Sequence, residues 1–95
     1  MLTVGLIGAG RIGRVHASTI SMHANSKLVA VADVIEDNAQ KLARDFGIQV
    51  YSTDAIYKDK SIDAVLVASS TDTHSEIIEK ATLAGKAVLC EKPVD

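Results

Sequence analysis

The sequence predicts an α/β fold in which helices cover both faces of a parallel sheet. Short apolar runs alternate with segments of helical periodicity along the 95 residues, and such alternation produces parallel sheets through right-handed crossovers. The apolar runs are continuous, which is typical of strands buried on both faces. Aromatic residues make up 3% of the chain and tryptophan is absent, so we expect a core of Val, Ile, Leu and Ala.

Five apolar runs are predicted to be strands, and they span residues 2–7, 28–33, 48–51, 62–68 and 87–90. Right-handed crossovers predict the spatial order 3-2-1-4-5, with the short third strand at an edge. A complete doubly wound sheet normally has a sixth strand. We therefore expect residues 1–95 to form one domain that stops before its sixth strand.

Helices are predicted between the strands from residues, most of them apolar, at three- and four-residue spacing. These residues are Ile12, Val15, His16 and Thr19 in the first helix, Ala39, Leu42, Ala43 and Phe46 in the second, and Ile77, Ile78, Ala81 and Ala84 in the last. A short helix is predicted over residues 52–58. Thr73 and Glu76 have the spacing of a capping box that opens the last helix, and Gly47 and Gly85 are expected to end the second and last helices.

Charge and cysteine content exclude several classes of function. The net charge is −2 and no basic patch is present, so the sequence does not indicate a nucleic-acid partner. The single Cys90 rules out an internal disulfide, and the three histidines are too scattered to suggest a metal site. The apolar residues 2–10 are too few to span a membrane and follow no basic segment. We expect a cytoplasmic protein without a membrane anchor.

A glycine-rich turn follows the first predicted strand, with the sequence Gly8-Ala9-Gly10-Arg11-Ile12-Gly13. In this G-x-G-x-x-G pattern the first glycine permits a tight turn, the second lets a pyrophosphate approach the backbone, and the third lets the helix pack closely on the strand. The N-terminus of the following helix attracts anions. Gly8, Gly10, Arg11, Ile12 and Gly13 are therefore candidate dinucleotide contacts in a Rossmann-type fold, although a solvated position is the preferred interpretation of the Arg11 side chain.

Asp33 lies 20 residues after Gly13, at the end of the second predicted strand. A carboxylate at this position accepts hydrogen bonds from an adenosine ribose and repels a 2′-phosphate. The next seven residues contain no Arg or Lys to receive such a phosphate, so the sequence favours NAD over NADP. A simpler interpretation is a tight strand–helix turn with Asp33 as a strand cap, and methyltransferases also have a glycine-rich first loop with an acidic second strand end.

A second cluster is expected where the fourth and fifth strands end. Residues 69–73 and 91–93 follow these strands, and ligands of open parallel sheets bind beyond the carboxyl ends of the strands. Lys92 is the one cation in these two segments. It is placed to hold a substrate hydroxyl or to assist proton transfer during hydride removal, and a solvated lysine is the alternative.

Together, several motifs resemble the glucose–fructose oxidoreductase/inositol dehydrogenase family over the whole chain. They are the glycine turn with His16, Ala32-Asp33, Thr71-Asp72-Thr73-His74 and Glu91-Lys92-Pro93. The resemblance is strongest to inositol dehydrogenases, and Glu91-Lys92-Pro93 is its most specific part.

The resemblance implies hydride transfer between NAD and a hydroxyl-bearing carbon of a cyclitol or sugar. It implies that Lys92 contacts the substrate hydroxyl and the nicotinamide, that Glu91 orients Lys92, and that Ser69, Thr71 and His74 line the nicotinamide ribose. The family's second domain supplies a catalytic Asp and His and mediates oligomerisation. That domain is not found in residues 1–95, so we expect this chain alone to be inactive and to form homo-oligomers.

A different class of function stays open. An NAD/NADH-binding module or redox sensor needs the same glycine turn and the same Asp33, but it needs no proton-handling residue beside the nicotinamide. Lys92 therefore distinguishes the dehydrogenase from the sensor. A distant reductase of the dihydrodipicolinate reductase type is disfavoured by Glu91-Lys92-Pro93.

Overall fold

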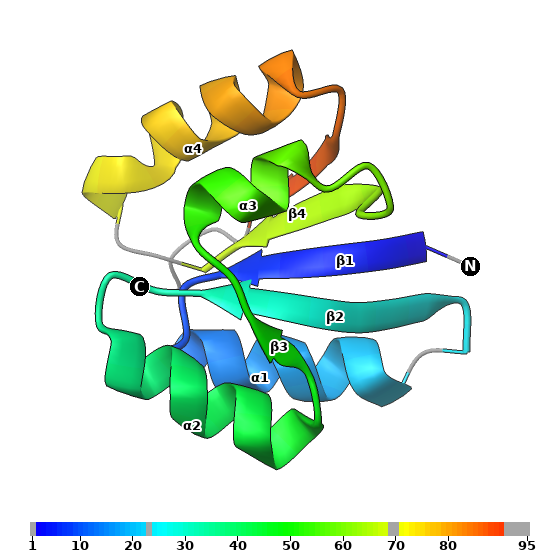
Figure 1. The fold of residues 1–95 in the computed structure, drawn as a ribbon, viewed down its shortest axis with the longest axis vertical. Helices are drawn as coiled ribbons and strands as arrows, with labels where there is room; N and C mark the ends of the chain where they lie inside the picture. The colour runs from blue at the N-terminus through cyan, green and yellow to red at the C-terminus, as the bar shows by residue number, and fades with distance from the viewer. Residues whose placement is uncertain (1, 23, 69–70, 91–95) are drawn as a thin grey trace.

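A computed structural model describes residues 2–22, 24–68 and 71–90, apart from the side chains of residues 71–75, 89 and 90. Strands and helices alternate along the chain (Figure 1). The elements are β1 (Leu2–Ile7), α1 (Arg11–Met22), β2 (Ser26–Ala32), α2 (Glu36–Phe46), β3 (Gln49–Val50), α3 (Thr53–Lys58), β4 (Ala64–Val67), α4 (Thr71–Leu83) and β5 (Ala87–Cys90).

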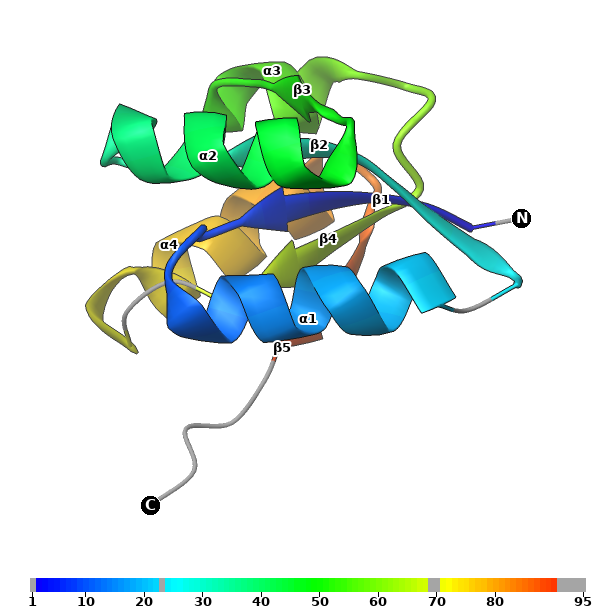
Figure 2. The same cartoon turned by 90° about the horizontal axis from the view of Figure 1, so that it is seen from below.

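The strands form one parallel sheet in the order β3-β2-β1-β4-β5, which confirms the predicted Rossmann-type topology. Ile7 at the end of β1 pairs with Ala32 of β2 and with Val67 of β4. These three carboxyl ends therefore lie at the same edge of the sheet. Figures 1 and 2 show the central strands enclosed by helices.

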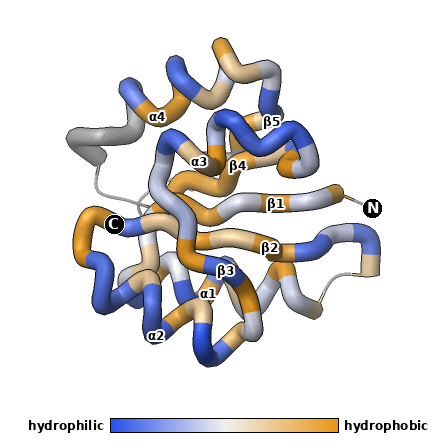
Figure 3. Tube along the Cα trace, in the orientation of Figure 1, coloured by the Kyte–Doolittle hydropathy of each residue, from blue (hydrophilic) through white to orange (hydrophobic). Residues whose placement is uncertain are grey.

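Alternate side chains of each central strand enter different cores. In β1, Leu6 packs with α1 and α2, whereas Ile7 packs with α3 and α4. In β4, Leu66 and Val67 are divided in the same way. Burial on both faces explains why these strands read as continuous apolar runs, and the hydropathy colouring in Figure 3 shows orange strands inside bluer helices.

The buried side of α1 differs from the predicted one. Gly13, Ala17 and Ile20 face the core, whereas Ile12 and Val15 are 52% and 58% exposed. Gly13 explains the difference, because a Cβ at this position would overlap the carbonyl oxygen of Gly8. The helix approaches the turn through its smallest residue, and the stripe of larger apolar residues consequently faces outward.

The start of α4 also differs from the prediction. The helix begins at Thr71, so Thr73 lies inside the helix and cannot be its N-cap. Ile77 and Ala81 are buried as predicted, but Ile78 and Ala84 are exposed. The predicted helix ends are confirmed, because Gly47 and Gly85 have positive φ angles of 67° and 79°, which glycine adopts without steric cost.

A buried lysine joins two connections at the amino edge of β4 and β5. The Lys86 ammonium donates hydrogen bonds to the carbonyl oxygens of Asp59 at 2.6 Å and Ile62 at 2.7 Å, and the residue is 8% exposed. Both carbonyls belong to the connection between α3 and β4. Lys86 therefore fixes that connection to the start of β5, and it supplies a charged donor to the Ile62 carbonyl and a second donor to the Asp59 carbonyl, which also accepts from the Ile62 amide.

Replacing Lys86 tests this contact. Lys86→Met keeps the length of the side chain but leaves two carbonyl oxygens without their charged donor, so we expect the free energy of unfolding to fall by about 1–3 kcal/mol. Urea denaturation followed by circular dichroism measures the change. The exposed Lys41→Met serves as the control, with an expected change within about 0.5 kcal/mol. Equal effects of the two substitutions would contradict the assigned role of Lys86.

Candidate functional site

The glycine turn connects β1 to α1 at the carboxyl edge of the sheet. Gly8 has a φ angle of 108°, a conformation that a residue with a side chain rarely adopts. Its amide donates to the Ala32 carbonyl at 2.8 Å, and the Arg14 amide donates to the Gly10 carbonyl at 3.0 Å. The backbone therefore reverses from strand to helix within three residues, Gly8 to Gly10.

Gly10 and Gly13 have opposite surroundings. A Cβ at Gly13 would overlap the Gly8 carbonyl, but a Cβ at Gly10 would meet nothing within 4 Å. Protein packing thus requires the glycine at 13 and leaves open space at 10. Gly10 precedes the N-terminus of α1, and the first turn of this helix carries no acidic residue. The open space and the free N–H groups fit a pyrophosphate approaching the backbone.

Asp33 joins the end of β2 to the glycine turn. One carboxylate oxygen accepts a hydrogen bond from the Ala9 amide at 2.7 Å, and the other accepts one from the Ile35 amide at 2.9 Å. Sequence reasoning did not foresee the bond to Ala9. The two bonds fix the orientation of the carboxylate, and each oxygen keeps a lone pair that can accept a ribose hydroxyl.

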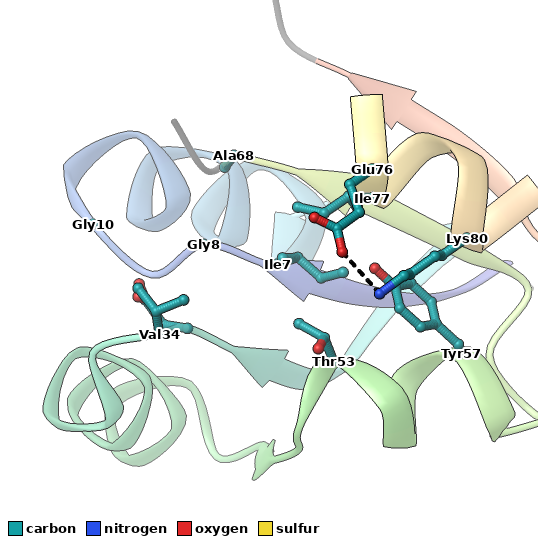
Figure 4. Close-up of a pocket in the computed structure, with 11 residues that line it drawn as sticks. Ile7, Gly8, Gly10, Val34, Thr53, Tyr57, Ala68, Glu76, Ile77 and Lys80 are labelled. Carbon is teal, nitrogen blue, oxygen red and sulfur yellow. Dashed lines mark ion pairs between the residues drawn. The ribbon is translucent and has the colours of Figure 1, made fainter. Parts of the chain in front are cut away.

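A cavity of about 410 Å³ extends from this turn across the edge of the sheet (Figure 4). Its volume lies within the range of small-molecule sites. The end of β1, the glycine turn, the residues just after β2 and β4, and the helices α3 and α4 line it: Ile7, Gly8, Gly10, Asp33, Val34, Thr53, Tyr57, Ala68, Glu76, Ile77 and Lys80. Three predicted site residues, Gly8, Gly10 and Asp33, thus line the cavity. They do so together with residues of α3 and α4 that the sequence analysis did not identify.

Two of these residues, both in α4, form an ion pair. Lys80 is 2.9 Å from the carboxylate of Glu76, one turn earlier in α4, and both side chains are drawn beside Tyr57 in Figure 4. The hydrogen bond from Lys80 and its positive charge lower the pKa of Glu76, and the same interaction raises the pKa of Lys80. Burial raises the pKa of the Tyr57 hydroxyl. All three groups therefore keep their usual charge at neutral pH.

The other predicted site residues lie elsewhere. Arg11 and Ile12 are exposed in the first turn of α1 and do not line the cavity. Ser69, Glu91 and Lys92 lie outside the described residues, as do the side chains of Thr71 and His74. Contacts between these residues and a dinucleotide or substrate stay predictions.

The described residues contain neither a candidate membrane-spanning helix nor a candidate metal site. No helix in the described ranges is long and apolar enough to cross a membrane. Among the same residues, no group of three or more His, Cys, Asp or Glu side chains gathers to hold a metal ion.

Several known proteins are similar to this chain in sequence and in fold. The inositol 2-dehydrogenase of Rhizobium meliloti is 50% identical over 91 residues, which are 96% of this chain and 28% of that protein. A myo-inositol dehydrogenase from Corynebacterium glutamicum superposes with a TM-score of 0.90 at 38% identity, covering 100% of this chain and 29% of the other. The myo-inositol dehydrogenase of Lactobacillus casei, solved with NAD(H) and myo-inositol, superposes with a TM-score of 0.92 at 33% identity over 98% of this chain and 29% of that one.

The chain also matches a protein family over nearly its whole length. Residues 2–95 match the Gfo/Idh/MocA oxidoreductases over their NAD-binding Rossmann fold. The chain spans less than a third of the length of the relatives that it resembles. The glycine turn, the ordered Asp33 and the cavity lie where such a fold binds its dinucleotide, and the chain belongs to the Gfo/Idh/MocA oxidoreductase family as an NAD-binding Rossmann domain.

Proposed function

We propose that this chain is the cofactor-binding part of a dehydrogenase that transfers a hydride between NAD and a hydroxyl-bearing carbon of a cyclitol or sugar. The observation that carries the proposal is the pairing of open space at Gly10 with a carboxylate at Asp33 whose two oxygens are already oriented by backbone amides. The bound nicotinamide supplies the hydride acceptor. The residues of this chain bind the dinucleotide and fix its orientation.

Each part of the dinucleotide has a partner in the proposal. The pyrophosphate lies over Gly10 and receives hydrogen bonds from the N-terminus of α1. The adenosine ribose donates its hydroxyls to Asp33. A 2′-phosphate would bring negative charge close to this carboxylate, so NAD is preferred to NADP.

The substrate assignment rests on the relatives and on the second sequence cluster. The Rhizobium meliloti protein is an inositol 2-dehydrogenase, and the Lactobacillus casei structure contains NAD(H) and myo-inositol. In the proposal Lys92 contacts the substrate hydroxyl beside the nicotinamide and Glu91 orients it. Ser69, Thr71 and His74 line the nicotinamide ribose. The remaining substrate contacts come from a second domain of the kind that these longer relatives would carry.

We also propose that copies of this domain associate. β5 is an edge strand of the described sheet, and the unpaired backbone groups of an edge strand favour pairing with another chain. The exposed Ile12 and Val15 of α1 add apolar surface.

Gly10→Val tests the phosphate position. The side chain points into open space, so the domain should fold, but it occupies the volume that the pyrophosphate needs. We expect NADH binding, followed by nicotinamide fluorescence, to weaken by at least about 100-fold, because both the backbone contact and the helix terminus become inaccessible. Circular dichroism provides the folding control. A folded variant that binds NADH like the parent would show that the turn is structural only.

Asp33→Ala tests cofactor choice. Loss of the carboxylate should weaken NAD binding by about 1–3 kcal/mol, the usual cost of losing a charge-assisted hydrogen bond. NADP binding should weaken much less, because a repulsive charge is removed at the same time. Calorimetric titration with both cofactors measures the ratio, and Asp37→Ala on the exposed side of α2 is the control. Equal affinity of the unmodified chain for NAD and NADP would refute the assignment.

Lys92 is tested in a chimera in which this chain replaces its matched segment of the Rhizobium meliloti inositol 2-dehydrogenase. We expect the chimera to reduce NAD with myo-inositol, and Lys92→Met to lower kcat by about 100-fold or more while NADH affinity stays nearly unchanged. Lys60→Met is the matched control. A folded chimera that binds NADH without turnover favours the redox-sensor alternative, and unchanged turnover in Lys92→Met removes Lys92 from the mechanism.

A further inference from the structure

Beyond Asp33, the cavity continues to a polar end that the glycine turn and the ribose do not use. Ile7, Ile77 and Glu76 line its middle, and Tyr57 and Lys80 stand at the end farthest from Gly10 (Figure 4). The end wall is built from α3 and α4, two helices that contribute nothing to the glycine turn. A ligand that fills the whole cavity therefore needs an apolar middle and a polar far edge.

The purine base of the dinucleotide meets both requirements. This step rests on the proposed function: with the pyrophosphate at Gly10 and the ribose at Asp33, the base attached to that ribose is the next group along the cavity. A purine has flat apolar faces and a polar edge. One face lies over Ile7 and Ile77, which line the cavity and are 4% and 7% exposed, and its edge then meets Glu76 and Lys80.

The carboxylate of Glu76 is available at this position because it does not cap its own helix. The spacing of Thr73 and Glu76 suggested a capping box, but α4 starts at Thr71 and Glu76 pairs with Lys80 instead. The low pKa of Glu76 keeps the group ionised, so it accepts hydrogen bonds and donates none. Lys80 uses one of its three donors on Glu76 and retains others for an acceptor in a ring.

We propose that Glu76 and Lys80 recognise one edge of the adenine base, with Glu76 accepting a hydrogen bond from the 6-amino group and Lys80 donating to the adjacent ring nitrogen N7. A base with a carbonyl oxygen at position 6 places an acceptor against the Glu76 carboxylate and is disfavoured. The pair is thus a specificity determinant for the base of the cofactor. The Glu76 and Lys80 side chains are 66% and 51% exposed, so solvent moderates the preference.

The test compares NAD with nicotinamide hypoxanthine dinucleotide, which has a carbonyl in place of the 6-amino group and a proton on N1, whereas N7 is an acceptor in both bases. We expect the unmodified chain to bind NAD about fivefold to tenfold more tightly, as befits one charge-assisted hydrogen bond at a partly exposed site. Glu76→Gln should bring the ratio of the two dissociation constants close to one, because an amide both accepts and donates. Calorimetry provides both constants without requiring turnover.

Glu79→Gln is the matched control. It removes the same charge from an exposed residue of the same helix that does not line the cavity, so it should leave the ratio unchanged. Equal binding of the two dinucleotides by the unmodified chain, with Gly10→Val abolishing both, overturns the adenine proposal and leaves the proposed function standing. Equal shifts of the ratio in Glu79→Gln and Glu76→Gln also overturn it. If the folded chain binds neither dinucleotide, the proposed function fails and this inference fails with it.

Discussion

The close contact between α1 and the glycine turn before it is the constraint on which the candidate dinucleotide site depends. Gly13 lies against the Gly8 carbonyl with no room for a Cβ, and this contact sets how near the helix comes to β1. It directs Gly13, Ala17 and Ile20 into the core and leaves Ile12 and Val15 outside. It also leaves the helix N-terminus facing open space at Gly10. The packing of one glycine thus determines where an anion can approach the backbone.

Asp33 extends that constraint to the next strand. Its carboxylate accepts from Ala9 of the turn and from Ile35 beyond β2, so the turn, the strand end and the proposed ribose acceptor form one hydrogen-bonded unit. A carboxylate oriented before the ligand arrives loses little conformational entropy on binding. The simpler interpretation of Asp33 as a strand cap is therefore compatible with the ribose role, since the same oxygens have lone pairs for both.

The features that could be predicted from the sequence are those that depend on local residue patterns. The strand order, the helix ends at Gly47 and Gly85 and the tight turn at Gly8 follow from residue types and their spacing. The prediction failed at α1 because two stripes of helical spacing compete and only the contact at Gly13 decides between them. It also missed the cavity wall. No cation follows Asp33 closely in the sequence, but Lys80, which is far along the chain, lines the same cavity because α4 lies beside it.

The central claim is that a dinucleotide binds along one line from Gly10 past Asp33 into the cavity. The most direct measurement is an NMR titration of the ¹⁵N-labelled chain with NAD, in which amide shifts are mapped onto the structure. The account predicts that the largest changes fall on the amides of Gly10, Arg11 and Val34, with smaller ones at Ile77. Changes concentrated instead at the opposite edge of the sheet, around Lys27 and Lys60, would contradict it.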